Sequence, residues 1–229
     1  MQARDVMVSP VITVKQSCTV REVAKIFIEQ RISGVPVVDD QGKLVGIVGE
    51  GDLMHRSEAD TERKRSWWLH ALTPDETLAA DYVKAHACRV ADVMTRHVIT
   101  AAPDAPLREI AALLEKNSVK RVPIMENGHL VGIVSRANLV QAVASTGTGM
   151  QASPSDTAIR DKLLAHLKTQ PWAHTGLLNI TVTDGIVDLW GLTSSDAERK
   201  AIRVAAECEL GVHAVNDHLV ARRSQGWWQ

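Results

Sequence analysis

The sequence predicts an α/β (α+β) protein with two β-α-β-β-α modules packed as a pair and a small C-terminal α-β-β-α-β domain. The first observation behind this prediction is an internal repeat. Asp5-Val6-Met7 returns as Asp92-Val93-Met94, and Val35-Pro36-Val37 returns as Val122-Pro123-Ile124, each 87 residues later. The second is a change of pattern, because a Ser/Thr/Gly-rich stretch at 145–149 separates the repeats from a new set of helix and strand signals.

Each copy of the repeat shows the same order of elements. It begins with a short predicted strand, at 11–13 in the first copy and 98–100 in the second. An amphipathic helix follows, behind a Thr19-x-x-Glu22 capping box or just after Pro106. A last helix begins near Asp52 or Ser135. The paired strands between these helices are predicted at 35–38, 44–48, 122–125 and 130–134.

The C-terminal third has its own pattern of helices and strands. Apolar residues from Ile159 to Leu167 form one helix face, and Asp184-Gly185 is a strong hairpin turn between two alternating strands. Ser195 caps a second helix, and a closing strand spans 212–220. The predicted domains are a first module at 1–56, a helical insertion at 57–86, a second module at 87–146, a linker at 147–154 and the C-terminal domain at 155–223.

The insertion at 57–86 carries two further features. Its basic run, 62–65, is interpreted as a solvated face, and Trp67-Trp68 as a docking or oligomer contact.

Composition argues against several kinds of partner. With 26 basic and 27 acidic residues, the net charge of -1 gives no field that would hold the chain on nucleic acid or on an anionic membrane. Three widely spaced cysteines favour neither a disulfide framework nor a zinc knuckle, so a reducing compartment fits best. The sequence contains no secretion signal and no apolar stretch of bilayer length, which predicts a cytoplasmic protein.

No catalytic or metal-binding pattern is found in the sequence. It has no GxSxG elbow, Walker loop or HExxH helix. His213 and His218 fall on opposite sides of a predicted strand, which disfavours a shared metal. We therefore expect a non-enzymatic protein with no catalytic residues and no metal site.

The repeats resemble CBS domains, the regulatory modules named after cystathionine β-synthase, and the tandem pair resembles a Bateman module. The resemblance rests on the strand-to-helix signature Gly-h-h-Ser/Thr-x-x-Asp, where h is apolar. It reads Gly46-Ile47-Val48-Gly49-Glu50-Gly51-Asp52 in the first copy and Gly132-Ile133-Val134-Ser135-Arg136-Ala137-Asn138 in the second. The first copy lacks the hydroxyl, and the second carries an amide in place of the carboxylate.

The chemistry of this signature suits a nucleotide. A strand that runs into a helix presents free N–H groups and a positive dipole end to phosphate, and Ser135 adds a hydroxyl there. The carboxylate of Asp52 can accept hydrogen bonds from both ribose hydroxyls, whereas the amide of Asn138 accepts at one end only. The alternative is a purely structural role, in which Asp52 and Ser135 only cap helices and Lys120-Arg121 is a solvated edge.

The resemblance implies an adenine slot that includes Thr13 with residues 32–35, and Thr100 with residues 119–122. The family often places a basic residue before the second strand, where it contacts phosphates, and Lys120-Arg121 stands at that point in this sequence. One implied site contains Thr13, Lys120, Arg121, Ser135 and Asn138, and the other contains Gly49, Asp52 and Thr100, with Val35 and Val122 beside the adenine. We favour the first site for a charged nucleotide (AMP, ADP or ATP), in preference to S-adenosylmethionine. The second suits a less charged adenosyl ligand or stays empty.

The C-terminal domain resembles a BON domain, through Gly185-x-Val187-x-Leu189-x-Gly191 and Gly211-Val212-x-x-Val215. That family is suspected of binding membranes or lipids, but here a structural or partner-docking role fits the cytoplasmic modules at least as well. Two hypotheses follow. The chain is either a regulatory protein that responds to an adenine nucleotide, or a ligand-independent scaffold whose BON domain engages a protein partner or lipid. In both cases we expect a homodimer.

Overall fold

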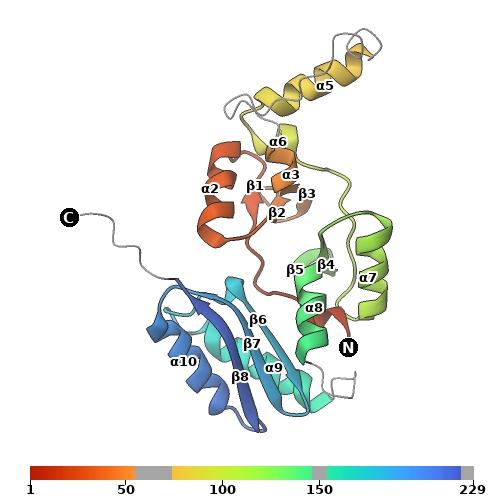
Figure 1. The fold of residues 1–229 in the computed structure, drawn as a ribbon. Coiled ribbons are helices and arrows are strands. Elements are labelled where there is room, and N and C mark those ends of the chain that lie inside the picture. Colours follow the sequence, from red (N-terminus) through yellow and green to blue (C-terminus); the bar gives the residue numbers. More distant parts are fainter. Residues whose placement is uncertain (55–73, 146–153, 223–229) are drawn as a thin grey trace, which may run out of the picture. The chain divides into compact units, whose positions relative to one another are not determined.

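The protein consists of two compact units, each with its own core. A computed structural model describes residues 1–54, 74–145 and 154–222 (Figure 1). One unit is Ile12–Val98, and the other joins Met1–Val11 to Ile99–Gln229. The predicted α/β (α+β) class and the order of elements within each module are confirmed.

The Ile12–Val98 unit contains the first module. Its sheet has the order β1-β2-β3, with β1 (Val14–Lys15) parallel to β2 (Gly34–Val38) and β3 (Leu44–Gly49) antiparallel to it. Helix α2 (Val20–Gln30) begins at the predicted capping box, because the Thr19 hydroxyl accepts from the Glu22 N–H and Glu22 accepts from the Thr19 N–H. Helix α3 (Glu50–Leu53) follows β3.

Among its described residues, this unit has two further helices. In the predicted insertion, Asp75–His86 forms α5, while Trp67-Trp68 and residues 62–65 lie outside the described residues. Helix α6 (Val90–Val93) comes next in the chain.

The second module repeats this plan inside the other unit. Strands β4 (Arg121–Glu126) and β5 (His129–Ser135) pair antiparallel, helix α7 (Leu107–Lys116) precedes them and helix α8 (Arg136–Ser145) follows. The core of this module contains buried residues from α1, α7, both strands and α8. These are Ala3, Val6, Ala105, Ile110, Leu114, Val122, Ile124, Val134 and Ala142.

The predicted first strands, 11–13 and 98–100, are wrong. The structure instead has β1 at Val14–Lys15 in the first copy and a single parallel bridge between Ala101 and Ile124 in the second. Proline explains the difference. A parallel ladder extended toward the N-terminus would need an N–H from Pro36 or Pro123, and proline has none.

Each short helix at the start of a repeat packs on the other repeat. Helix α1 (Ala3–Val6) contributes to the core of the second module, whereas Val90 and Val93 of α6 contribute to the core of the first. The methionine that follows each short helix lies against a glycine of a strand, Met94 against Gly46 of β3 and Met7 against Gly132 of β5. A Cβ on Gly46 would lie 2.6 Å from Met94 Sδ, and a Cβ on Gly132 would overlap Met7 Sδ. The units of packing therefore differ from the units of the sequence repeat.

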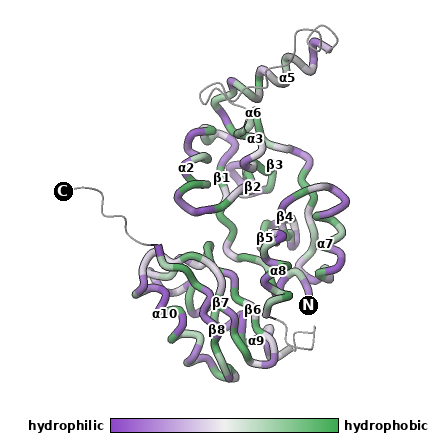
Figure 2. The backbone as a smooth tube through the Cα atoms, viewed as in Figure 1, coloured by the Kyte–Doolittle hydropathy of each residue, from purple (hydrophilic) through white to green (hydrophobic). Residues whose placement is uncertain are grey.

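The C-terminal domain lies in the same unit as the second module. Its sheet has the order β6-β7-β8, with β6 (Leu178–Thr183) antiparallel and β8 (Ala214–Ala221) parallel to β7 (Ile186–Thr193). Helices α9 (Pro154–Lys168) and α10 (Asp196–Glu207) bury one face of this sheet. Hydrophilic and hydrophobic residues are interspersed along α10 (Figure 2). The predicted Ser195 cap is confirmed, because its hydroxyl accepts from the Glu198 N–H.

Candidate functional site

The junction between β5 and α8 holds two of the predicted site residues in one cap. The Asn138 oxygen (Oδ1) accepts from the Ser135 N–H at 2.7 Å and from the Ser135 hydroxyl at 2.7 Å. The Asn138 amide nitrogen (Nδ2) donates to Gln141 Oε1 at 3.2 Å. Both ends of the Asn138 amide are therefore engaged, and its side chain is buried at 6% exposure. A ribose hydroxyl has to compete with Ser135 for this oxygen.

Lys120 and Arg121 lie beside the same junction. Arg121 is the direct partner of Ser135 in the antiparallel register of β4 and β5. The Lys120 carbonyl accepts from the Arg136 N–H, the first N–H of α8, at 3.3 Å, and the Lys120 side chain is exposed. Two basic residues and a serine hydroxyl thus surround the N-terminus of a ten-residue helix. This arrangement provides the chemistry that binds phosphate.

The first module has the same backbone at its junction but different side chains. Gly34 is the direct partner of Gly49, and the Glu50 N–H donates to the Ser33 carbonyl at 3.2 Å. The Gly49 N–H donates to Asp52 Oδ2 at 2.8 Å. The other carboxylate oxygen of Asp52 takes part in no hydrogen bond among the residues that the structure describes. This junction retains an acceptor for ribose but has no side chain opposite Gly49.

The remaining predicted residues lie near these junctions in sequence. Thr13 directly precedes β1 and Thr100 precedes the Ala101 bridge, and both side chains are exposed. Val35 and Val122 are fully buried and belong to the cores of their modules. Thr13, Val35, Gly49 and Asp52 lie in one compact unit, and the other predicted site residues lie in the second. The pairing of Thr13 with Ser135, and of Thr100 with Asp52, stays a prediction.

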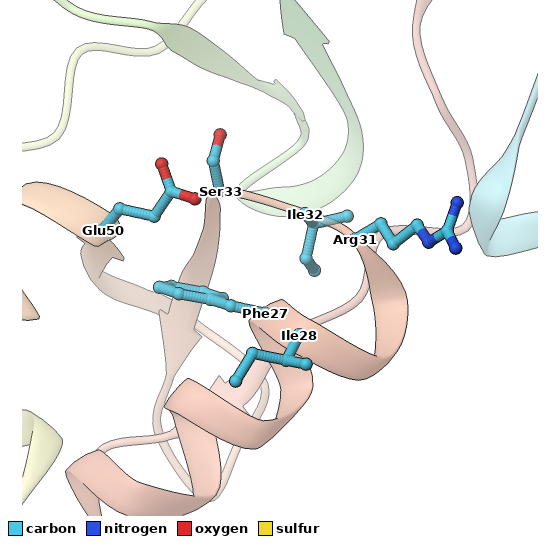
Figure 3. A pocket seen from close by; sticks show the side chains of 6 residues that line it. All are labelled: Phe27, Ile28, Arg31, Ile32, Ser33 and Glu50. Atoms are coloured by element: carbon cyan, nitrogen blue, oxygen red, sulfur yellow. The ribbon is translucent and has the colours of Figure 1, made fainter.

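A pocket of 340 Å³ opens on the first module (Figure 3). Phe27, Ile28 and Ile32 give it an apolar wall, and Ser33 and Glu50 add polar groups. The Arg31 side chain, also in the lining, extends away from Glu50. Ile32 and Ser33 belong to the predicted adenine segment, whereas Phe27 and Glu50 were not predicted as site residues. Phe27 follows the pattern of a core helix position, so its sequence context gave no sign of a pocket.

Helix α8 connects the second module to the C-terminal domain within their shared unit. Gln141 Oε1 accepts from Asn179 Nδ2 of β6 at 2.7 Å. The Ser145 hydroxyl oxygen accepts from the Thr181 hydroxyl at 3.0 Å and from the Trp190 indole N–H at 3.4 Å. None of these five residues was predicted as functional, because each looks like a solvated polar position or an ordinary strand position.

A buried arginine adds to this contact. Arg160 of α9 is 4% exposed, and it donates through Nε to the Ile180 carbonyl at 2.7 Å and through Nη2 to the Met7 carbonyl at 2.7 Å. Burial lowers the pKa of its guanidinium, while Asp161 and Asp5 act in the opposite direction. Arginine keeps its charge in proteins, so the two carbonyls hold a buried cation.

The described residues hold no metal-ligand set, since no three His, Cys, Asp or Glu side chains gather in one place. His218 instead bonds Asp188 at 3.2 Å and stacks on Trp190. None of the helices that the structure describes is both long enough and apolar enough to cross a membrane.

Comparison with protein families assigns both parts of the chain. The CBS domain model matches residues 3–59 and 90–145, and the BON domain model matches residues 155–223. Uncharacterized protein MJ1426 of Methanocaldococcus jannaschii is 32% identical over 159 residues, which cover 62% of this chain and 91% of the relative.

Two further comparisons show the range of proteins that carry this module pair. The A-adding tRNA nucleotidyltransferase of Aquifex aeolicus is 29% identical over 143 residues, which are 62% of this chain but only 14% of that enzyme. The crystal structure of CBSX2 in complex with AMP matches with a TM-score of 0.54 and 27% identity, and the match covers 62% of this chain and 96% of that one.

Proposed function

The chain belongs to the CBS-domain family, with a tandem CBS pair followed by a BON domain, and we propose that it is a non-enzymatic regulatory protein that binds an adenine nucleotide. The BON domain is the output or docking module of this proposal. The nucleotide is AMP, ADP or ATP, in preference to S-adenosylmethionine. The functional form is a cytoplasmic homodimer that acts on a protein partner.

The observation that carries the proposal is the phosphate chemistry at the start of α8. Arg121 stands opposite Ser135 in the sheet register, and Lys120 adjoins the first N–H of the helix. A hydroxyl and two cations at the positive end of a helix favour a group with two or more negative charges. The positive charge of both side chains attracts an anionic group, so the residues favour a nucleotide over a nucleoside.

The ribose end of the proposal rests on Asp52. Its Oδ2 atom holds the Gly49 N–H, and the second carboxylate oxygen remains to accept from a ribose hydroxyl. A hydrogen bond to an ionised carboxylate is stronger than one to an amide. In the Bateman arrangement that the family resemblance implies, Thr13 and Thr100 complete the two sites. The AMP complex of the similar protein CBSX2 supports the ligand class.

A thermal-shift and calorimetry series tests the proposal. AMP, ADP, ATP and S-adenosylmethionine are added separately to the full chain, and at about 100 times Kd a bound ligand contributes about 2.7 kcal/mol of stability. For a chain of this size we expect Tm to rise by roughly 5 °C or more with at least one adenine nucleotide. The Arg121→Ala/Ser135→Ala double variant should lose most of this rise.

The matched control is Arg108→Ala, which removes the same charge from an exposed position on α7 of the same module. It should leave the nucleotide effect unchanged. Absence of any shift or heat with all four ligands would overturn the proposal and favour the ligand-independent scaffold. An equal loss in the control variant would show that overall charge, not the α8 junction, attracts the nucleotide.

A further inference from the structure

Three side-chain amides form a continuous line from the α8 junction to the C-terminal domain. One oxygen, Gln141 Oε1, accepts from Asn138 Nδ2 on the side of the CBS module and from Asn179 Nδ2 on the side of β6. The two distances are 3.2 and 2.7 Å. Gln141 is therefore an acceptor shared by a candidate nucleotide residue and a residue of the BON domain.

The line starts at the group that a nucleotide would contact. Asn138 Oδ1 is held by the Ser135 N–H and the Ser135 hydroxyl. Since the amide of asparagine is planar and rigid, a displacement of Oδ1 also displaces Nδ2. A phosphate that takes the Ser135 hydroxyl, or a ribose hydroxyl that donates to Oδ1, therefore turns the Asn138 amide and withdraws its N–H from Gln141.

At the BON end of the line, the side chain of Asn179 is incompletely satisfied, which favours an arrangement in which it contacts water. Asn179 is 4% exposed, and its Oδ1 has no hydrogen-bond partner among the described residues. An unpaired buried acceptor is unfavourable, and contact with water relieves it. The neighbouring contacts of α8 with β6 and β7, through Ser145, are also hydrogen bonds between polar groups. Polar contacts of this kind are typical of domain interfaces that open and close.

We propose that Gln141 couples nucleotide binding at the α8 junction to docking of the BON domain on α8. This inference rests on the proposed function and adds its direction. The docked domain holds Asn138 in the position that excludes the ligand, so the nucleotide favours release of β6 from α8. Because coupling is reciprocal, docking weakens nucleotide binding by the same factor.

The test combines calorimetry with hydrogen exchange on the full chain, with AMP and ATP as the probes. Calorimetry measures affinity, and exchange of the backbone amides of residues 178–183 measures docking. Gln141→Ala removes the shared acceptor. Gln141→Glu keeps an acceptor for both asparagine N–H groups. Val140→Ala is the matched control, because Val140 lies next to Gln141 on α8 and is 68% exposed.

In the wild type we expect nucleotide to raise the exchange rate at residues 178–183 severalfold. Gln141→Ala should show this faster exchange without ligand and no further rise with it. It should also bind nucleotide about 2- to 10-fold more tightly, the worth of one hydrogen bond. Gln141→Glu and Val140→Ala should behave as the wild type.

The outcomes separate the two proposals. Nucleotide heat without any change in exchange at 178–183 would overturn the coupling and leave the nucleotide site intact. Equal or weaker nucleotide binding by Gln141→Ala would also overturn the coupling. If Gln141 had only a structural role, its removal would not increase the affinity for nucleotide. Absence of heat with both nucleotides in the wild type would overturn the proposed function, and the coupling with it.

Discussion

The two CBS modules share a backbone at the strand-to-helix junction but differ in the side chains of that junction. In the first module Gly34 lies opposite Gly49, and Asp52 supplies a carboxylate. In the second, Arg121 lies opposite Ser135, and an amide replaces the carboxylate at Asn138. Equivalent hydrogen bonds, at 3.2 and 3.3 Å, join the first N–H of each helix to the carbonyl of the residue just before β2 or β4.

This difference indicates a division of roles between the repeats. In the proposed function, the first junction supplies the ribose acceptor, whereas the second supplies the phosphate-binding groups and hydrogen-bonds to the C-terminal domain through Gln141. Repetition preserves the fold because the core positions, such as Val35 and Val122, are equivalent and fully buried. The side chains at the junction do not support the core, so they can diverge without loss of the fold.

The largest effect is expected where the second module meets the BON domain. Arg160→Met removes the cation that holds the Ile180 and Met7 carbonyls, and hydrogen bonds to charged groups contribute about 1.5–3 kcal/mol each. We expect a loss of about 3 kcal/mol or more in urea unfolding, with faster amide exchange at residues 178–183. Residues 34–38 of the first module serve as the internal reference. Arg203→Met, at an exposed pair with Glu207, should change stability by less than about 0.5 kcal/mol.

An unchanged exchange rate at 178–183 in Arg160→Met would contradict the view that the second module and the BON domain share one cooperative unit.

A smaller effect compares the two strand glycines, Gly132 beside Met7 and Gly46 beside Met94. Gly132→Ala would place a Cβ against the Met7 side chain, whereas Gly46→Ala would meet Met94 Sδ at 2.6 Å. Overpacking costs about 1–3 kcal/mol. We expect Gly132→Ala to be the more destabilising in thermal unfolding, because its closest neighbours include Met7 Cβ at 3.0 Å, an atom attached to the backbone, whereas the atom nearest to a Cβ on Gly46 is Met94 Sδ, in the flexible part of that side chain. Equal losses of stability in the two variants would show that the surroundings of Gly46 and Gly132 are equally rigid.

The smallest effect comes from an exchange of the signature residues. Asn138→Asp supplies a second ribose acceptor and removes the donor to Gln141, so nucleotide affinity should rise about tenfold. Asp52→Asn should lower affinity at the first module by a similar factor. Calorimetry of both variants measures these changes. Equal affinities in the wild type and both variants would mean that neither residue contacts the ribose.

Local patterns predicted much of this fold. The capping box at Thr19 and the helix periodicity that follows it depend on neighbours three or four residues away, and the structure has both. The repeat itself predicted which strands pair. The predicted position of the first strand in each module was wrong because its ladder would need an N–H from Pro36 or Pro123, which proline lacks. This constraint lies in the partner strand and not in the first strand itself.

The features that sequence could not predict depend on contacts distant in the chain. The segment Asp5-Val6-Met7 is too short to indicate which module it packs on. Gln141 reads as a solvated helix position and Asn179 as the polar side of a strand, and only the packing of α8 on β6 brings them together. The candidate nucleotide residues were found from the signature alone, but the engagement of both ends of Asn138 required the geometry.

The crossed packing of α1 has a consequence for synthesis on the ribosome. Residues 3–7 are translated before the second module, yet Ala3 hydrogen-bonds to Ala105, and α1 is buried by elements that are translated later still. The unit Ile12–Val98 has a core of its own, so we expect it to fold while translation continues. Residues 3–7, which include the apolar Val6 and Met7, meet their partners only after the second module has been translated. We therefore expect a pause in translation between the two modules to leave a folded first module beside an exposed apolar segment, which is a target for chaperones and proteases.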